Sequence, residues 1–203
     1  MLKIPLPAWA IRNAYRIFDV ESSGEAAVVD NRLHEYAFVL SEITKMKPGK
    51  ILDVGCAARI NVVPPFASCM GWRVYGLDNR EWSYEHDNFE MLTQDVNDTL
   101  PECEYDAVVL LSTIEHVGFA GRYGIRKQDD QADVKAMQNL FQATKLGGTL
   151  LLTAPFTLSD KTSRPLSRVY NTASLQHLLN DWCIQTVAVT PDKSTVLLKA
   201  VRN

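Results

Sequence analysis

The sequence lacks the features of several protein classes. No apolar run approaches the roughly 20 residues of a membrane-spanning helix, because the longest runs, 107–111 and 150–152, have the length of a strand. There is no excess of basic residues, and the net charge of −3 at pH 7 argues against bulk binding to DNA or RNA. There is also no internal repeat and no low-complexity tract. We therefore expect neither a membrane partner nor a nucleic-acid partner.

Cysteine is scarce and scattered. The four cysteines form no C-x-x-C motif and no Cys/His pair at metal-binding spacing, and they are Cys56, Cys69, Cys103 and Cys183. Free thiols without disulfides are typical of a reducing compartment. Near the N-terminus, Pro5, Pro7 and Arg12 interrupt any apolar core of a signal peptide. These features predict a cytoplasmic protein without a structural metal.

The composition is that of an ordinary globular domain. The chain has 203 residues, of which 46% are hydrophobic and 22% charged, enough apolar material for a sizeable core. This length predicts one domain over 1–203. Within it we expect an N-terminal helical segment over 1–48 and a main fold over 49–203.

Helical and strand-like patterns alternate along the chain. Apolar residues recur at helical spacing before the stop at Lys47–Gly49, and again before Gly147 and Gly148. Helices are predicted over 33–46 and 65–71, from 134 to the stop at Gly147, and over 172–181, the last with Thr172 as its N-cap. Short apolar runs predict strands over 51–55, 72–77, 91–95, 105–111, 149–153, 184–190 and 195–201.

This alternation predicts an α/β fold with a Rossmann-like, doubly wound sheet. The sheet is expected to be mostly parallel, with an antiparallel C-terminal hairpin whose turn is Pro191–Lys193. Two segments, 117–131 and 156–171, are longer than a simple connection requires. Both follow strands, so both should lie at the carboxyl edge of the sheet, where such folds bind ligands.

Acidic residues stand at the ends of three successive predicted strands. Asp53 is followed by Gly55, which permits a tight turn and a close approach of a ligand to the backbone. Asp78 lies at the end of the next strand, about 25 residues after Asp53 in the sequence. This spacing is suited to an acid that binds ribose hydroxyls. Asp95 ends the third strand. The pattern favours a nucleoside site over chance decoration of the surface.

Five segments in order resemble the successive motifs of class I S-adenosylmethionine-dependent methyltransferases. They are 51–57, 74–78, 94–96, 105–116 and 145–155. The C-terminal hairpin is similar to the reversed last strand of that family. The stretch 112–124 with 129–136 resembles a branch found among small-molecule and polysaccharide-biosynthesis methyltransferases. Ile114–Val117 is similar to a motif of O-methyltransferases in quinone biosynthesis.

The resemblance implies S-adenosyl-L-methionine as cofactor and a role for each matching residue. Asp53, Gly55, Cys56 and Ala57 would line the methionine end, and Asp78 with Asn79 would take the ribose hydroxyls. Asp95 would accept from the adenine amino group, while Val96 would donate its backbone N–H to the ring. Ser112 and Ile114 would border the methionine amino group and the sulfonium.

The glycine-rich loop departs from the family pattern. The family has Gly-x-Gly-x-Gly, whereas this chain has Gly55, Cys56, Ala57, Ala58 and Arg59. One extra methyl group at Ala57 is compatible with a negative φ. Arg59 would either crowd the site or pair with the carboxylate of the cofactor.

His116 and its neighbour Glu115 are the candidate catalytic residues. A histidine just past a central strand is suited to accept a proton from a hydroxyl nucleophile near neutral pH. His116 as a simple turn residue is the alternative. A divalent metal on this pair is less favoured, because adjacent side chains diverge and no third ligand is evident.

The sequence thus favours methyl transfer to an oxygen atom of a small molecule. The basic residues of the two long segments suit an anionic acceptor, although they also suit an ordinary solvated surface. Two alternatives remain: a cofactor-binding protein without catalysis, and a nicotinamide-dependent oxidoreductase. Tyr123 and Lys127 have the spacing of a dehydrogenase pair, but no Gly-x-Gly-x-x-Gly is present. The sequence leaves the acceptor and the oligomeric state open.

Overall fold

The computed structural model describes residues 31–203, apart from 59, 101–103, 122, 124, 126, 160–162 and 165–166. The contacts within the chain divide it into two units, 1–30 and 31–203. Arg59 and most of the predicted N-terminal helical segment lie outside the described residues.

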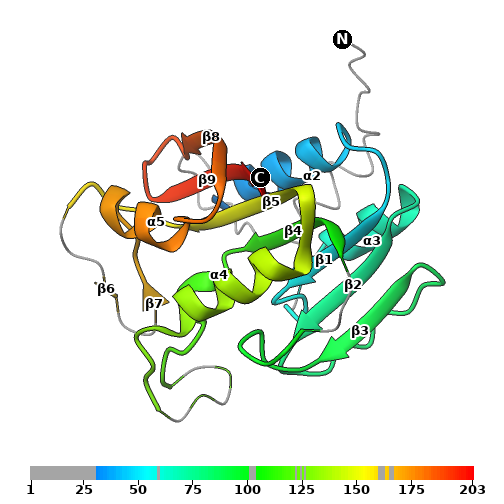
Figure 1. The fold of residues 1–203 in the computed structure, drawn as a ribbon, viewed down its shortest axis with the longest axis horizontal. Helices are drawn as coiled ribbons and strands as arrows, with labels where there is room; N and C mark the ends of the chain where they lie inside the picture. The colour runs from blue at the N-terminus through cyan, green and yellow to red at the C-terminus, as the bar shows by residue number, and fades with distance from the viewer. Residues whose placement is uncertain are drawn as a thin grey trace, which may run out of the picture. The chain divides into compact units, whose positions relative to one another are not determined.

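A seven-stranded sheet forms the centre of the described part of the chain, in the order β3-β2-β1-β4-β5-β9-β8 (Figure 1). The strands are β1 Lys50–Val54, β2 Arg73–Asp78, β3 Phe89–Thr93, β4 Tyr105–Leu111, β5 Thr144–Pro155, β8 Cys183–Val189 and β9 Thr195–Val201. The first five are parallel to one another, whereas β9 is antiparallel to both β5 and β8. The predicted doubly wound fold with its C-terminal hairpin is confirmed.

Helices cover both faces of the sheet. They are α2 Asn31–Ile43, α3 Val63–Cys69, α4 Ala132–Ala143 and α5 Thr172–Leu178. Figure 1 shows α4 in front of the sheet and α2 behind it. Because both faces are covered, β4 is a continuous apolar run in which Ala107–Leu110 are fully buried. None of the described helices has the length and apolar character to cross a membrane.

Several helix boundaries differ from the predictions by two or more residues, and two of the differences have a clear structural cause. The helix expected to stop at Gly147 ends at Ala143 instead, because Thr144 already pairs with Tyr105 as the start of β5. Gly147 has φ +76° within the bulge that follows, and its N–H donates to the Arg202 carbonyl. The N-cap of α5 is Asn171, not Thr172, because Asn171 and Ser174 form a reciprocal capping box.

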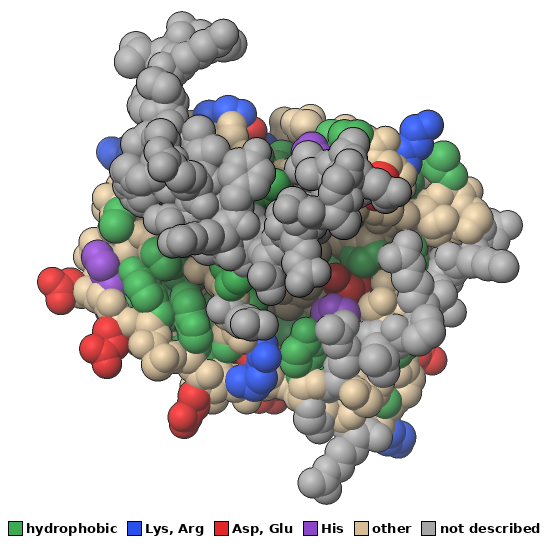
Figure 2. Space-filling view, turned by 180° about the vertical axis from the view of Figure 1, so that it is seen from behind, with side chains coloured by type: hydrophobic (Ala, Val, Ile, Leu, Met, Phe, Trp, Pro, Cys, Tyr) green, Lys and Arg blue, Asp and Glu red, His purple; other side chains and the backbone are tan. Residues whose placement is uncertain are grey.

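Aromatic side chains fix the segment that follows β2. The rings of Trp82 and Tyr84 stack at 5.2 Å between centroids, and both meet the ring of Phe89 edge-on. Figure 2 shows apolar side chains gathered on the side of the molecule where β3 lies. These ring contacts fix the position of the chain just beyond Asp78, at the end of β2.

Candidate active site

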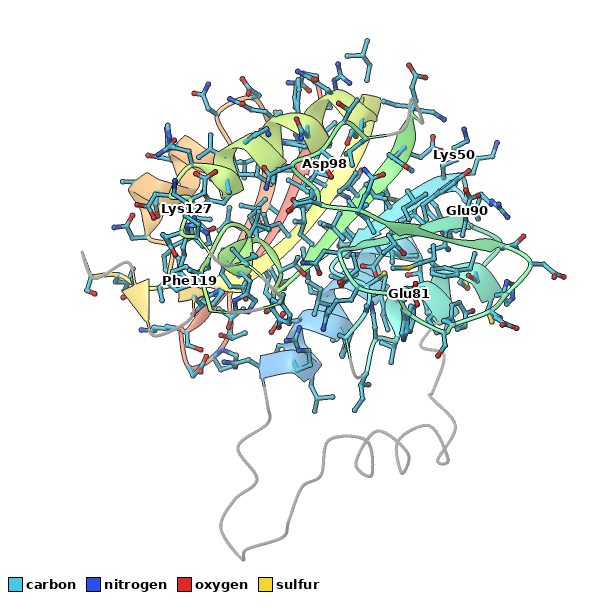
Figure 3. The ribbon with its side chains drawn as sticks, turned by 90° about the horizontal axis from the view of Figure 1, so that it is seen from below. Lys50, Glu81, Glu90, Asp98, Phe119 and Lys127 are labelled. Atoms are coloured by element: carbon cyan, nitrogen blue, oxygen red, sulfur yellow. The ribbon has the colours of Figure 1, made fainter. Side chains whose placement is uncertain are left out.

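The parallel strands end at one edge of the sheet. In Figure 3, Phe119, which follows β4, lies at one end of the molecule, while Lys50 and Glu90 at the strand starts lie at the other. The register pairs Val54 with Leu77 and with Leu110, so the ends of β1, β2 and β4 are adjacent. The polar residues that follow these strands therefore converge, as the sequence predicts.

A glycine turn connects β1 to the segment before α3. Gly55 has φ +79°, and a Cβ added there would lie 2.4 Å from Thr113 Oγ1. Thr113 cannot easily move away, because its hydroxyl donates to the Val54 carbonyl at 3.0 Å. Only glycine satisfies both the backbone angle and the close packing, so the chain passes tightly over the end of the sheet.

Asp53 is almost fully buried, with 2% of its surface exposed. Burial raises the pKa of its carboxyl group to about 7; the hydrogen bond from Asn61 opposes the rise, and the charge of Asp78 adds to it. Asn61 donates at 2.6 Å to Asp53 and at 3.1 Å to the Cys56 carbonyl. Asn61 thus fixes the glycine turn, a role that the sequence motif does not reveal.

Asp78 is buried and accepts hydrogen bonds on both carboxylate oxygens. Oδ1 accepts from the backbone N–H and Nε of Arg80 at 3.0 and 2.9 Å. Oδ2 accepts from the backbone N–H of Ala57 at 3.0 Å and from Nη2 of Arg80 at 3.1 Å. The glycine turn and the end of β2 therefore meet at this carboxylate.

The remaining predicted residues of the first three strand ends differ in exposure. Cys56 is buried, its sulfur lies 3.6 Å from that of Met91, and burial raises the pKa of its thiol, so it packs as a neutral group. Asn79 is exposed and donates to the Tyr123 carbonyl at 2.9 Å. Asp95 is exposed and accepts from the backbone of Asn97, whereas Val96 is buried.

Ser112, directly after β4, has an unusual backbone angle. Its φ of +47° is rare for a residue other than glycine and costs about 1–3 kcal/mol. The conformation is held by several contacts: its N–H donates to Thr153, and its hydroxyl donates at 2.6 Å to Glu35. Such an enforced angle at a strand end is typical of a functional position.

Glu35 of α2 is a buried residue whose place at this edge the sequence does not indicate. It is 4% exposed and accepts from the hydroxyls of Ser112 and Thr153, both at 2.6 Å. The spacing of α2 indicates only a helix face, and nothing in it links Glu35 to strands 77 and 118 residues away. The contact places a third carboxylate at the carboxyl edge.

Glu115 and His116 lie in a short 3-10 turn, Ile114–His116. Glu115 Oε1 is 3.7 Å from His116 Nε2, and the imidazole meets the ring of Tyr123 edge-on at 5.5 Å. Glu115 is 2% exposed, whereas His116 keeps 15% of its side chain accessible. The side chain of Ile114 is packed in the core, so this residue faces away from solvent.

Arg168 holds the base of the long segment after β4. It donates to the carbonyls of Val117 and Asp129, and its Nε lies 3.4 Å from the carboxylate of Asp133. Tyr170 donates to the same carboxylate at 2.9 Å, and burial raises the pKa of its hydroxyl well above the usual value. Arg168, one of the basic residues of the segment 156–171, is therefore engaged within the protein.

No group of three or more histidine, cysteine or acidic side chains that could hold a metal ion occurs among the described residues. The three cysteines described, Cys56, Cys69 and Cys183, are free thiols. The described site thus combines carboxylates, amides, hydroxyls, backbone groups and the imidazole of His116.

No protein-family model matches the chain, and no curated protein matches it in sequence. Several solved structures match it in fold. The 1,6-didemethyltoxoflavin-N1-methyltransferase of Burkholderia thailandensis, solved with bound 1,6-didemethyltoxoflavin and S-adenosylhomocysteine, is 17% identical with a TM-score of 0.63. That match covers 100% of this chain and 93% of the other.

Two further structures show the breadth of this fold. The N-methyltransferase NodS of Bradyrhizobium japonicum, in complex with S-adenosylhomocysteine, is 14% identical with a TM-score of 0.60, covering 84% of this chain and 86% of its own. The [4+2]-cyclase SpnF is 12% identical with a TM-score of 0.62, covering 83% and 80%. The chain has the fold of S-adenosylmethionine-dependent methyltransferases.

Proposed function

We propose that this protein binds S-adenosyl-L-methionine at the carboxyl edge of its sheet and transfers the methyl group to a small molecule. The observation that carries the proposal is the meeting of the Gly55 turn with the buried carboxylate of Asp78, through the N–H of Ala57. This arrangement lies where open α/β sheets bind nucleosides. Similar folds solved with S-adenosylhomocysteine support the same ligand.

The residues present fit the charge of this cofactor. Its sulfonium and ammonium groups are cationic, and three buried carboxylates stand at the same edge: Asp53, Asp78, which pairs with Arg80, and Glu35, which lies 3.4 Å from Arg32. A cation beside Asp53 would favour its ionised form and offset the cost of burial. Asp78 with Asn79 would hold the ribose, Asp95 and Val96 the adenine, and Ser112 the methionine amino group. Cys56 would pack beneath the turn.

Bound there, the cofactor supplies an electrophilic methyl carbon, and the protein must orient and deprotonate the acceptor. We propose that an imidazole nitrogen of His116, which remains partly accessible beside Tyr123, accepts the proton of the acceptor hydroxyl. The buried carboxylate of Glu115 at 3.7 Å would stabilise the imidazolium that forms. The proton thus passes from the acceptor hydroxyl to His116.

The acceptor is proposed to be a small metabolite with an oxygen nucleophile, anionic in character, and the reaction to be cytoplasmic. Two of the similar structures are N-methyltransferases, so a nitrogen nucleophile is the direct competitor. Because acceptor segments vary freely on one scaffold, a panel of sugar, phenol and amine acceptors must decide between them. Nucleic acid is not expected as a substrate, given the net charge of −3.

Calorimetric titration with S-adenosylhomocysteine, with NADH as the control ligand, tests the proposal. We expect micromolar binding of the first and none of the second, and Asp78→Ala should abolish binding. Absence of binding to S-adenosylhomocysteine would contradict the proposal, and binding of NADH would favour an oxidoreductase. Binding without turnover on any acceptor would instead indicate a non-catalytic binder.

The role of His116 is tested by substitution. His116→Ala should lower kcat/KM by about 100-fold at pH 7, with the affinity for S-adenosylhomocysteine unchanged. His177→Ala, which removes an exposed histidine of α5, is the matched control and should leave both quantities unchanged. A variant at position 116 that keeps full kcat/KM across pH 6–8 would refute the assignment.

A further inference from the structure

Arg80 lies at the point where the ribose is proposed to bind, and its side chain is fixed from two sides. Its guanidinium forms a two-pronged ion pair with Asp78, at 2.9 and 3.1 Å. Its carbon Cζ lies 4.6 Å from the centre of the Tyr123 ring, a cation–π distance. Nothing in the assigned roles of the site residues uses this arginine.

The hydrogen-bond acceptor positions of the Asp78 carboxylate are all occupied. An ionised carboxylate offers about four acceptor positions, two on each oxygen. Each oxygen of Asp78 already accepts two hydrogen bonds, three from Arg80 and one from Ala57. A ligand hydroxyl can therefore bind Asp78 only by displacing one of these donors. The side chain of Arg80 is the one that can leave, because it is 42% exposed, whereas the two backbone donors are fixed.

Tyr123 extends this contact toward the candidate base. Its carbonyl accepts from Asn79 at 2.9 Å, its ring lies against Arg80, and the same ring meets His116 edge-on at 5.5 Å. Tyr123 has φ +51°, an angle that is uncommon for a residue other than glycine. The turn after β2 and the catalytic histidine are thus connected through one side chain.

We propose that Arg80 competes with the ribose hydroxyls for Asp78, and that its displacement by the nucleoside loosens Tyr123 beside His116. This inference rests on the proposed function, since it takes Asp78 as the ribose-binding group. Arg80 would then lower the affinity of the site for the cofactor. The proposal also predicts an order of events, in which the nucleoside binds first and the surroundings of His116 then become accessible to the acceptor.

The experiment compares Arg80→Ala with the wild type in calorimetric titrations with S-adenosylhomocysteine and with adenosine. Because Arg80→Ala removes a partly exposed, two-pronged ion pair, it should increase the binding affinity for both ligands by about threefold to fivefold. Arg80→Lys, which keeps the charge but loses the fork, should give a smaller gain. It also carries the test if Arg80→Ala does not fold.

Arg73→Ala is the matched control. Arg73 lies at the opposite end of β2, pairs with Glu90 at 2.8 Å, and has the same 42% side-chain exposure. Its removal should leave both affinities within twofold of the wild type. Unchanged or weaker binding by Arg80→Ala would overturn the competition, because it would mean that Arg80 holds the ligand or is neutral toward it.

Hydrogen exchange of the peptide that contains Tyr123 tests the second half of the proposal. Its exchange should become faster when S-adenosylhomocysteine is added to the wild type, and should already be fast in Arg80→Ala. Unchanged exchange would overturn the link to Tyr123 even if the affinity rises. If neither the wild type nor any Arg80 variant binds the ligand, the proposed function fails and this inference falls with it.

Discussion

Asp53 is a buried carboxyl group whose ionisation opposes folding. Burial raises its pKa from 3.8 to about 7; the hydrogen bond from Asn61 opposes the rise, and Asp78 adds to it. Between these two values the folded chain holds one more proton at this site than the unfolded chain. The stability that Asp53 contributes is therefore fully present below pH 3.8 and is lost as the pH rises through about 7.

The substitution Asp53→Asn removes this titration. The unfolding free energy of the wild type minus that of the variant should fall by about 1.4 kcal/mol per pH unit between pH 4.5 and 7. The slope reaches that value only in the middle of this range, so the total fall between pH 4.5 and pH 8 should be about 3 kcal/mol. The buried amide of the variant adds an offset that does not vary with pH, so the slope carries the test. Urea denaturation followed by tryptophan fluorescence measures it.

Asp192→Asn is the control for this measurement. Hydrogen bonds from Thr190, Asn31 and Ser194 hold the pKa of Asp192 well below its usual value. Asp192 is consequently ionised in both the folded and the unfolded chain above pH 5, and its difference curve should be flat from pH 5 to 8. A flat or rising curve for Asp53 would refute the argument that burial dominates its ionisation.

Substitutions at three positions, two of them with matched controls, test the packing of the fold around the site by urea denaturation at pH 7. Gly55→Ala should destabilise the fold by about 3 kcal/mol, since it combines backbone strain with a clash against Thr113, whereas Gly71→Ala, with open space around it, should cost only about 1 kcal/mol. Glu35→Ala removes the acceptor of two hydroxyls and should cost about 3 kcal/mol, and Glu35→Gln less than half of that. Tyr170→Phe leaves a buried carboxylate with one donor fewer and should cost about 2 kcal/mol. Equal costs for the two glycine variants, or for the two Glu35 variants, would contradict these accounts.

The sheet was predictable because its strands are local signals. The run 51–55 corresponds to β1 at Lys50–Val54, and the turn at Pro191–Lys193 indeed joins β8 to β9. The sequence also predicted that Asp53 and Asp78 would lie at one edge, since parallel strands end together. These inferences need only periodicity and the geometry of parallel strands.

What the sequence could not predict depends on contacts between distant residues. Nothing in local spacing indicates that Glu35 accepts from Ser112, 77 residues away, or from Thr153, 118 residues away. The end of α4 was misplaced because a glycine pair is a good helix stop, yet pairing with Tyr105 ends the helix earlier. Tertiary pairing outweighed local propensity there.

Mapping S-adenosylhomocysteine by backbone amide chemical shifts tests the central claim most directly. The account predicts that the largest shifts occur at Gly55–Ala57, at Asp78–Arg80, at Val96 and at Ser112, the residues that meet at the carboxyl edge. Residues at the opposite edge, such as Lys50 and Lys145, should not respond. Shifts centred on that opposite edge, or none at saturating ligand, would contradict a cofactor site at the carboxyl ends of the strands.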